Sequence, residues 1–405
     1  MDYTALLLAV RPDAAKDLLA ILIVFASAKL AAELFERMNQ AGIVGEILVG
    51  ILIGPSILNW IAPNQLLTTL AELGVMFLLF RVGLEVKSSD LLKVGGTALV
   101  VAVAGVALPF VLGWGILLLW GEPQIEAIFV GAAMVATSVG ITAQVLAAKG
   151  LLHLGASRII MAAAVIDDVL GLLVLALVSS LAKGKINLVE LSMTAAVAIG
   201  FTVVVAKWGT KAMEKVMPRA SQLRLTEAQF AVAISILFGL SVLAIYAGVA
   251  AIVGAFLAGM ALSESVGRRV LDLTNGVTEL LVPFFLVGIG LHFDLAAFAT
   301  RGTMLLAAVI LVAAILTKVL GCGFGAYRLG RKDAIRVGVG MIPRGEVGMV
   351  VAQIGLSLGV IAQGIYGVVV FMSVATTLVA PPLLTWAYRE MIRPGEEDAD
   401  QIRLG

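Results

Sequence analysis

Long runs of apolar residues follow one another along the chain from about residue 17 to residue 388. Most are close to or above the roughly 20 residues that an α-helix needs to cross a bilayer. Glycine and proline stand at most of the boundaries between the runs, where they interrupt a helix. The pattern therefore predicts an all-α polytopic membrane protein with thirteen transmembrane helices. They lie at about 17–37, 42–59, 66–86, 92–119, 124–148, 156–182, 188–212, 225–247, 251–264, 274–292, 302–327, 333–358 and 364–388.

The composition agrees with a chain that lies mostly in lipid. Of 405 residues, 61% are hydrophobic and 14% are charged, and the mean hydropathy is +1.07. A water-soluble core cannot use so much apolar sequence. The net charge of +1 and the lack of a basic tail argue against nucleic acid as a partner. No catalytic triad, metal cluster or phosphate-binding glycine loop stands out, so we expect neither an enzyme nor a bound cofactor. The single cysteine, Cys322, excludes an intramolecular disulfide.

Lysine and arginine lie mainly in every second connection between the apolar runs. If the N-terminus lies outside, 20 of them face the cytoplasm, 5 lie outside and 3 lie within spans. Because positive charge concentrates in cytoplasmic loops, this imbalance predicts an outside N-terminus and a cytoplasmic C-terminus. No cleavage site follows the first run closely, so we expect that run to be retained as a span.

Two parts of the chain resemble one another at a separation of 207 to 209 positions. Residues 43–50 match residues 252–259, and residues 72–84 match residues 279–291. The separation corresponds to seven spans, which is an odd number, so the second copy should be inverted relative to the first. We therefore expect two inverted six-helix repeats joined by a linker helix, an architecture of many secondary transporters.

Two adjacent carboxylates, Asp167 and Asp168, stand within a long apolar run. A carboxylate at mid-membrane depth costs several kcal/mol, and neighbouring like charges resist ionising together. Such a pair is tolerated where it binds a cation, carries a proton or pairs with a buried base; a helix–helix hydrogen bond is the alternative. The corresponding positions of the second copy are Ala375 and Thr376, so the acidic site occurs once.

Two spans are interrupted at corresponding places by small residues and proline, at residues 136–142 and 340–348. Paired interruptions in the two halves of a transporter point to its binding site, since unwound backbone offers carbonyl oxygens to a cation. Thr137 and Ser138 add hydroxyl oxygens to the first interruption. The alternative for these two residues is that each hydroxyl bonds a carbonyl of its own helix.

Three further charges lie within the predicted spans. Lys318 stands in the middle of an apolar run, where an ammonium needs a partner or a depressed pKa. The aspartate pair is the obvious partner, and snorkelling to the interface is the alternative. Arg344 and Glu346 stand two positions apart in the second interruption. We expect them to offset charge at the half-helix ends, paired with each other or with charges of the first three spans.

Four motifs, in order along the chain, carry a resemblance to a known family. Residues 43–46, 136–142, 165–171 and 343–348 together resemble the NapA-type bacterial sodium/proton antiporters, of the monovalent cation:proton antiporter superfamily. The resemblance covers nearly the whole chain. It implies a thirteen-span homodimer in which a mobile core domain moves against a dimerisation domain, with two broken helices crossing in the core.

The resemblance also implies roles for individual residues. Asp168 becomes the essential ion-binding carboxylate, Asp167 the partner of Lys318, and Thr137 a residue at the crossing of the broken helices. The chain then divides into a dimerisation domain at 1–91 and 225–300, a core ion-transport domain at 92–182 and 301–390, a linker helix at 183–224 and a cytoplasmic tail at 391–405.

We therefore expect an electrogenic secondary transporter that exchanges Na⁺ (or Li⁺) for H⁺ across a bacterial inner membrane by alternating access. Asp167 and Asp168 would bind the Na⁺, with oxygen from Thr137 and Ser138, and Lys318 would either carry a second proton or act as a brace. A K⁺/H⁺ antiporter of the same fold is the nearest alternative. Potassium systems with a nucleotide-binding domain after the last span are not expected, because too few residues follow Arg393. A sodium-coupled symporter or a channel is a more distant alternative.

Overall fold

The computed structural model of the chain describes residues 12–38, 40–182, 188–220, 222, 225–293 and 300–391. Every regular element among these residues is a helix. The first 11 residues and the tail from 392 onward, for which the sequence predicted opposite sides of the membrane, lie outside the described residues.

Nine of the described helices contain an apolar window long enough to cross a membrane. They are α2 (Pro12–Arg37), α4 (Gln65–Glu85), α5 (Ser88–Trp120), α8 (Gly155–Ala182), α9 (Leu188–Ala220), α10 (Ala228–Tyr246), α12 (Arg268–Leu291), α13 (Arg301–Gly325) and α16 (Gln363–Tyr388).

The four other predicted spans coincide with shorter helices. Two are single helices of 12 residues, α3 (Gly42–Ile53) and α11 (Ala251–Leu262). The other two are each split into a pair, α6 (Gln124–Ala133) with α7 (Val139–Ala148), and α14 (Arg331–Gly340) with α15 (Glu346–Ser357). A 3₁₀ turn, η2 (Tyr327–Leu329), precedes α14. The apolar pattern thus located every helical region correctly, while the number of thirteen membrane crossings stays a prediction.

Five boundaries were wrong by more than a turn: the starts of α2, α5 and α12 and the ends of α3 and α9. The largest error is at the end of α9. The hydropathy pattern ended the seventh span near residue 212, but α9 continues to Ala220. The apolar run stops there because lysine and glutamate enter the sequence, yet lysine, glutamate, alanine and methionine all favour the helix. Hydropathy therefore marks where the apolar stretch ends rather than where the helix ends.

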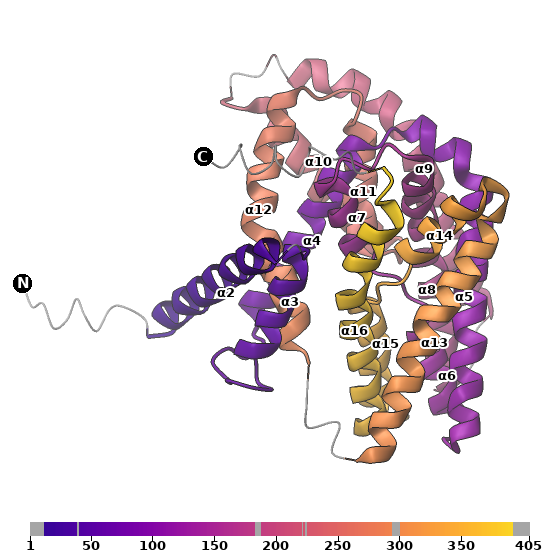
Figure 1. The fold of residues 1–405 in the computed structure, drawn as a ribbon. Coiled ribbons are helices and arrows are strands. Elements are labelled where there is room, and N and C mark those ends of the chain that lie inside the picture. The colour runs from indigo at the N-terminus through magenta and orange to yellow at the C-terminus, as the bar shows by residue number, and fades with distance from the viewer. Residues whose placement is uncertain are drawn as a thin grey trace, which may run out of the picture.

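The helices pack in two groups that lie side by side (Figure 1). In the first group, α4 packs against α11 and α12, α3 packs against α2 and α12, and α10 packs against α11. In the second group, α5 packs against α6, α8 and α13, while α13 packs against α14 and α16. Contacts of α4 with α7 and of α3 with α16 join the groups. The division of the chain into a dimerisation domain and a core domain stays a prediction.

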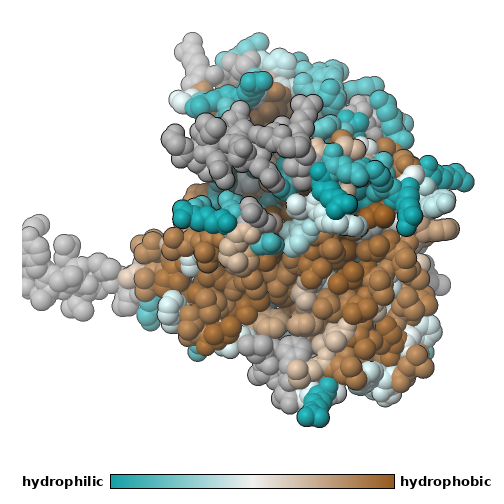
Figure 2. Space-filling model, viewed as in Figure 1, coloured by the Kyte–Doolittle hydropathy of each residue, from teal (hydrophilic) through white to brown (hydrophobic). Residues whose placement is uncertain are grey.

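The surface fits a protein embedded in lipid. Figure 2 shows a broad hydrophobic band across the molecule, with the hydrophilic side chains gathered mainly at one end. Large apolar side chains are exposed on several helices, including Leu119 at 91% and Phe324 at 78%. Water disfavours so much contiguous apolar surface, and a bilayer removes that cost.

Two close helix crossings fix the first group. Gly83 of α4 meets Gly259 of α11 so closely that a Cβ at Gly259 would overlap the Phe80 carbonyl oxygen. Gly50 of α3 meets Gly290 of α12 in the same way. Small residues at such crossings let backbones approach, which is how helices associate within membranes.

Candidate functional site

The two split helices meet at their breaks. The first break lies between Ala133 and Val139, and the second lies between Gly340 and Glu346. The backbone N–H of Ser138 donates to the carbonyl of Pro343 at 2.8 Å. Unwound backbone needs such partners, because no water is available in a bilayer to satisfy it.

Further contacts tighten this junction. Thr142 Oγ1 donates to the Gly340 carbonyl at 2.7 Å across the two breaks. Gly345 has no room for a side chain, since a Cβ there would overlap Ser138. Pro343 and Gly345, which loosen the second helix in the sequence, are therefore also residues through which the two breaks touch.

Helix α16 fastens the second break from the other side. The N–H of Arg344 donates to Thr376 Oγ1 at 3.1 Å, and Thr377 Oγ1 donates to the carbonyl of Arg344 at 3.2 Å. In the internal sequence similarity, Thr376 stands at the position that corresponds to Asp168. A hydroxyl of α16 thus holds backbone at the position that the sequence similarity aligns with Asp168.

Lys318 of α13 and Asp167 of α8 form a buried ion pair. Lys318 Nζ lies 3.2 Å from Asp167 Oδ1, and the two side chains are 0% and 1% exposed. Lys318 therefore does not snorkel to the interface. The other carboxylate oxygen, Asp167 Oδ2, is buried without a hydrogen-bond partner among the described residues.

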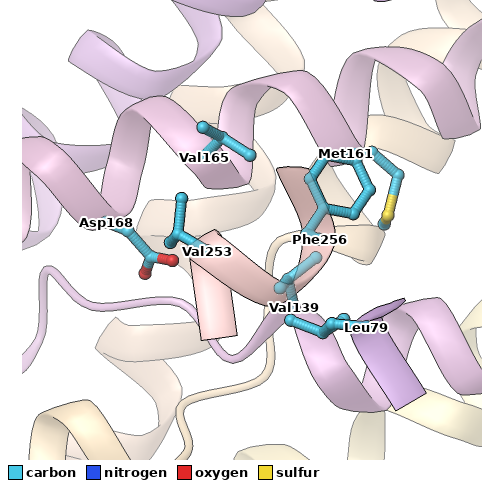
Figure 3. A pocket seen from close by; sticks show the side chains of 7 residues that line it. All are labelled: Leu79, Val139, Met161, Val165, Asp168, Val253 and Phe256. Atoms are coloured by element: carbon cyan, nitrogen blue, oxygen red, sulfur yellow. The ribbon is translucent and has the colours of Figure 1, made fainter. Parts of the chain in front are cut away.

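Asp168 faces different surroundings from its neighbour. It lines a small hollow together with Leu79, Val139, Met161, Val165, Val253 and Phe256. Figure 3 shows Asp168 at one end of this hollow, beside Val253. We call it the Asp168 hollow. Successive residues of a helix point about 100° apart, so one carboxylate reaches into the second helix group while the next faces the boundary with the first group.

Thr137 and Ser138 lie at the first break and are 4% and 5% exposed. Neither hydroxyl oxygen has a hydrogen-bond partner among the described residues. The alternative of bonding within their own helix is therefore not what the structure contains. Hydroxyl and carboxylate oxygens are suitable ligands for a hard cation.

Arg344 is fully buried, and within the described part of the chain its guanidinium bonds to carbonyl groups. Its guanidinium donates to the carbonyls of Ala314 at 3.1 Å and Ala136 at 3.5 Å. The side chain of Glu346, the other charge expected at this break, lies outside the described residues. Arg344 thus connects α13 to the first break, beside Thr137.

Sequence reasoning missed the apolar lining of the Asp168 hollow and the two threonines that hold Arg344. The lining residues carried no signal, since apolar side chains in apolar spans are the rule. Thr376 did carry a signal, because it stands at the position that corresponds to Asp168, and a second hydroxyl, Thr377, follows it.

A helical membrane bundle in which two broken helices meet beside buried charges defines a secondary transporter. Residues 21–390 match the model of a family described as sodium/hydrogen exchanger, transmembrane. The chain belongs to this family and is a multi-pass membrane protein. The resemblance to monovalent cation:proton antiporters is thereby confirmed.

Proteins of similar sequence and structure agree with this family assignment. The chain is 35% identical over 376 residues to the Na⁺/H⁺-K⁺ antiporter GerN of Bacillus cereus, covering 91% of this chain and 95% of that protein. It is 34% identical to the high-affinity Na⁺/H⁺ antiporter NhaS3 of Synechocystis, covering 91% and 88%. The solved structure of the sodium proton antiporter MjNhaP1 from Methanocaldococcus jannaschii matches with a TM-score of 0.65 and 15% identity, over 93% of this chain and 97% of that one. This last likeness shows the fold.

Proposed function

We propose that the protein exchanges Na⁺, or Li⁺, for H⁺ across a bacterial inner membrane. One observation carries the proposal: Asp168 faces a hollow at the boundary between the helix groups, next to the buried pair of Asp167 and Lys318. A carboxylate that holds either a cation or a proton, and never both, makes each species displace the other. The names of the relatives, which describe Na⁺/H⁺ antiporters, support this choice of ions.

The cation would bind to Asp168 and Asp167, with oxygen from the first break. Asp167 Oδ2, Thr137 Oγ1 and Ser138 Oγ are three buried oxygens without a hydrogen-bond partner among the described residues. Oxygen atoms are the ligands that hard cations prefer. Because these oxygens are buried, a cation must lose part of its hydration shell to bind to them.

Charge balance determines how many protons move. Asp167 and Lys318 balance one another as a buried ion pair in the second helix group. A bound Na⁺ adds one positive charge, and an unbalanced buried charge is costly. Loss of the Lys318 proton would remove this extra positive charge. If Lys318 and Asp168 each carry one proton back, two protons enter per Na⁺ released, and the exchange is electrogenic. If Lys318 is only a brace, one proton moves and the exchange is electroneutral.

The architecture would follow from the same proposal. Thirteen spans in two inverted repeats would place the N-terminus outside and the C-terminus in the cytoplasm. The group with α4 and α11 would form the dimer contact of a homodimer in the lipid bilayer. The group with α8 and the two breaks would move against it like an elevator, exposing Asp168 to each side in turn.

A K⁺/H⁺ antiporter is the second candidate, because GerN is named a Na⁺/H⁺-K⁺ antiporter. Purified protein in liposomes with an internal pH dye separates the two. After an imposed pH gradient, we expect external Na⁺ or Li⁺ to dissipate it and K⁺ to have little effect. Dissipation by K⁺ alone would favour the second candidate. No response to any of the three ions would contradict both, and would favour a symporter or a channel.

A further inference from the structure

We propose that Tyr388 is a positioning residue for the ion site, because it fastens the helix of the two aspartates to the helix that holds the second break. This role rests on the proposed exchange and adds a residue to it. Tyr388 ends α16, and its hydroxyl is hydrogen-bonded to Ser157 Oγ, near the start of α8, at 3.1 Å. The two residues are 1% and 0% exposed, so water does not compete for this hydrogen bond.

Helix α8 connects this contact rigidly to the ion site. Ser157 stands ten positions before Asp167, which is about 15 Å at the rise of an α-helix. No glycine or proline lies between the two residues, and sharp bends in helices occur mainly at such residues. A shift or rotation of α8 at Ser157 therefore moves both aspartates with it.

The second break lies against the same part of α8. A Cβ at Gly340, the last residue of α14, would overlap the side chain of Ile160, three positions after Ser157. Thr142 of the first split helix donates to the carbonyl of the same glycine. The position of α8 at this point therefore also determines how the aspartates lie relative to the breaks.

The end of α16 is held by Arg336 of α14. This end follows Pro381 and Pro382, which remove two backbone donors from the helix, so it depends on support from its neighbours. Arg336 is 4% exposed and donates from Nε to the Ala387 carbonyl at 3.2 Å. Its Cζ lies 5.3 Å from the centre of the Tyr388 ring, a distance at which a cation and an aromatic ring attract. The ring is thereby fixed where its hydroxyl reaches α8.

Two carboxylates complete this end of the second helix group. Asp333 accepts a hydrogen bond from the Arg336 guanidinium at 2.7 Å and so holds it in place. Lys332 and Glu390 form an exposed ion pair at 2.6 Å between α14 and the residues after α16. Exposed pairs contribute little to stability. The buried contacts of Arg336 and Tyr388 therefore provide most of the connection.

The consequence for transport is a fixed distance between the proposed ligands of the cation. Asp167 and Asp168 lie on α8, whereas Thr137 and Ser138 lie at the first break. Groups that bind one ion together must be held within about 0.5 Å of the productive geometry. Loss of the Tyr388 hydroxyl should therefore weaken Na⁺ binding although it removes no proposed ligand.

The test compares Tyr388→Phe, Ser157→Ala and the double variant in proteoliposomes. The apparent KM for Na⁺, the maximal rate of Na⁺-driven H⁺ movement and the midpoint of thermal unfolding are measured on the same preparations. Each single variant leaves a buried hydroxyl without its partner, which is destabilising, whereas removal of both partners is nearly neutral. We therefore expect the midpoint to fall in each single variant and to recover in the double variant.

The apparent Na⁺ affinity should not follow the midpoint. We expect KM to rise about threefold or more in all three variants, with a smaller change in the maximal rate, because none of them keeps the hydrogen bond between α8 and α16. Tyr366→Phe removes a half-buried hydroxyl near the other end of α16 and should leave KM unchanged.

Two results would overturn the positioning role and leave only a packing role. One is a KM that recovers together with the midpoint in the double variant. The other is a wild-type KM in folded Tyr388→Phe. Absence of Na⁺-dependent H⁺ movement in the wild type would instead contradict the proposed function itself.

Discussion

At the scale of single residues, the two adjacent aspartates are separated by their surroundings. Asp167 is paired with Lys318 at 3.2 Å, and Asp168 lines a hollow between helix groups. The sequence alone placed both carboxylates and the lysine in the membrane. It could not tell which aspartate faces which partner, because that depends on how α8 is rotated against α13.

Lys318→Gln tests the ion pair and the proton-carrier role together. Removing one partner of a buried ion pair leaves an uncompensated charge, which costs about 3–5 kcal/mol. We expect a clearly lower midpoint of thermal unfolding and an exchange that no longer responds to membrane voltage. The measurement is Na⁺-driven H⁺ movement under an imposed potassium-diffusion potential. If H⁺ movement by the wild type does not depend on this potential at saturating Na⁺, Lys318 has only a structural role.

The hydroxyl of Thr376 gives a second prediction at this scale. Thr376→Val removes the acceptor for the Arg344 N–H, and a buried donor without a partner costs about 1–3 kcal/mol. We expect lower thermal stability and weaker apparent Na⁺ affinity, since the break next to Ser138 loses its support. Thr274→Val is the matched control, because Thr274 is equally buried but bonds only within α12. Equal loss of Na⁺ affinity in both variants would argue against a specific role.

At the scale of helices, the close crossing of α4 and α11 makes a sharp prediction about stability. Gly259→Ala places a Cβ against the backbone of α4, and overpacking of this kind costs about 1–3 kcal/mol. Gly239→Ala in α10 meets nothing within 4 Å and should stabilise by about 0.5–1 kcal/mol. Thermal unfolding of the two variants should therefore shift in opposite directions. Equal midpoints would mean that the crossing is looser than described.

The sequence predicted the helices better than their contacts. Apolar runs located every helical region, and small residues with proline located both breaks, because these signals are local. The contact of Ser138 with Pro343 joins residues about 200 positions apart, and no local pattern reports such a pairing. The positions of Leu79, Val253 and Phe256 beside the Asp168 hollow could not be predicted for another reason. An apolar residue in an apolar helix gives the same sequence pattern whether it meets lipid, a neighbouring helix or the hollow.

At the scale of the whole molecule, the orientation in the membrane can be tested from the charged end of α9. Val216 is 36% exposed in the stretch that the positive charges assign to the cytoplasm. A cysteine introduced there should resist an impermeant reagent added to intact cells. A cysteine at Trp60, 64% exposed between α3 and α4, should react under the same conditions. The opposite pattern would invert the predicted topology.

The most direct test of the account is Na⁺-driven H⁺ movement by Asp168→Asn in proteoliposomes. Asparagine has nearly the shape of aspartate but can neither ionise nor exchange a proton for a cation. We expect the variant to fold and to remain in the membrane, because the pair of Asp167 and Lys318 and both helix breaks are untouched, and we expect exchange to be abolished. Exchange at the wild-type rate in folded Asp168→Asn protein would contradict the account.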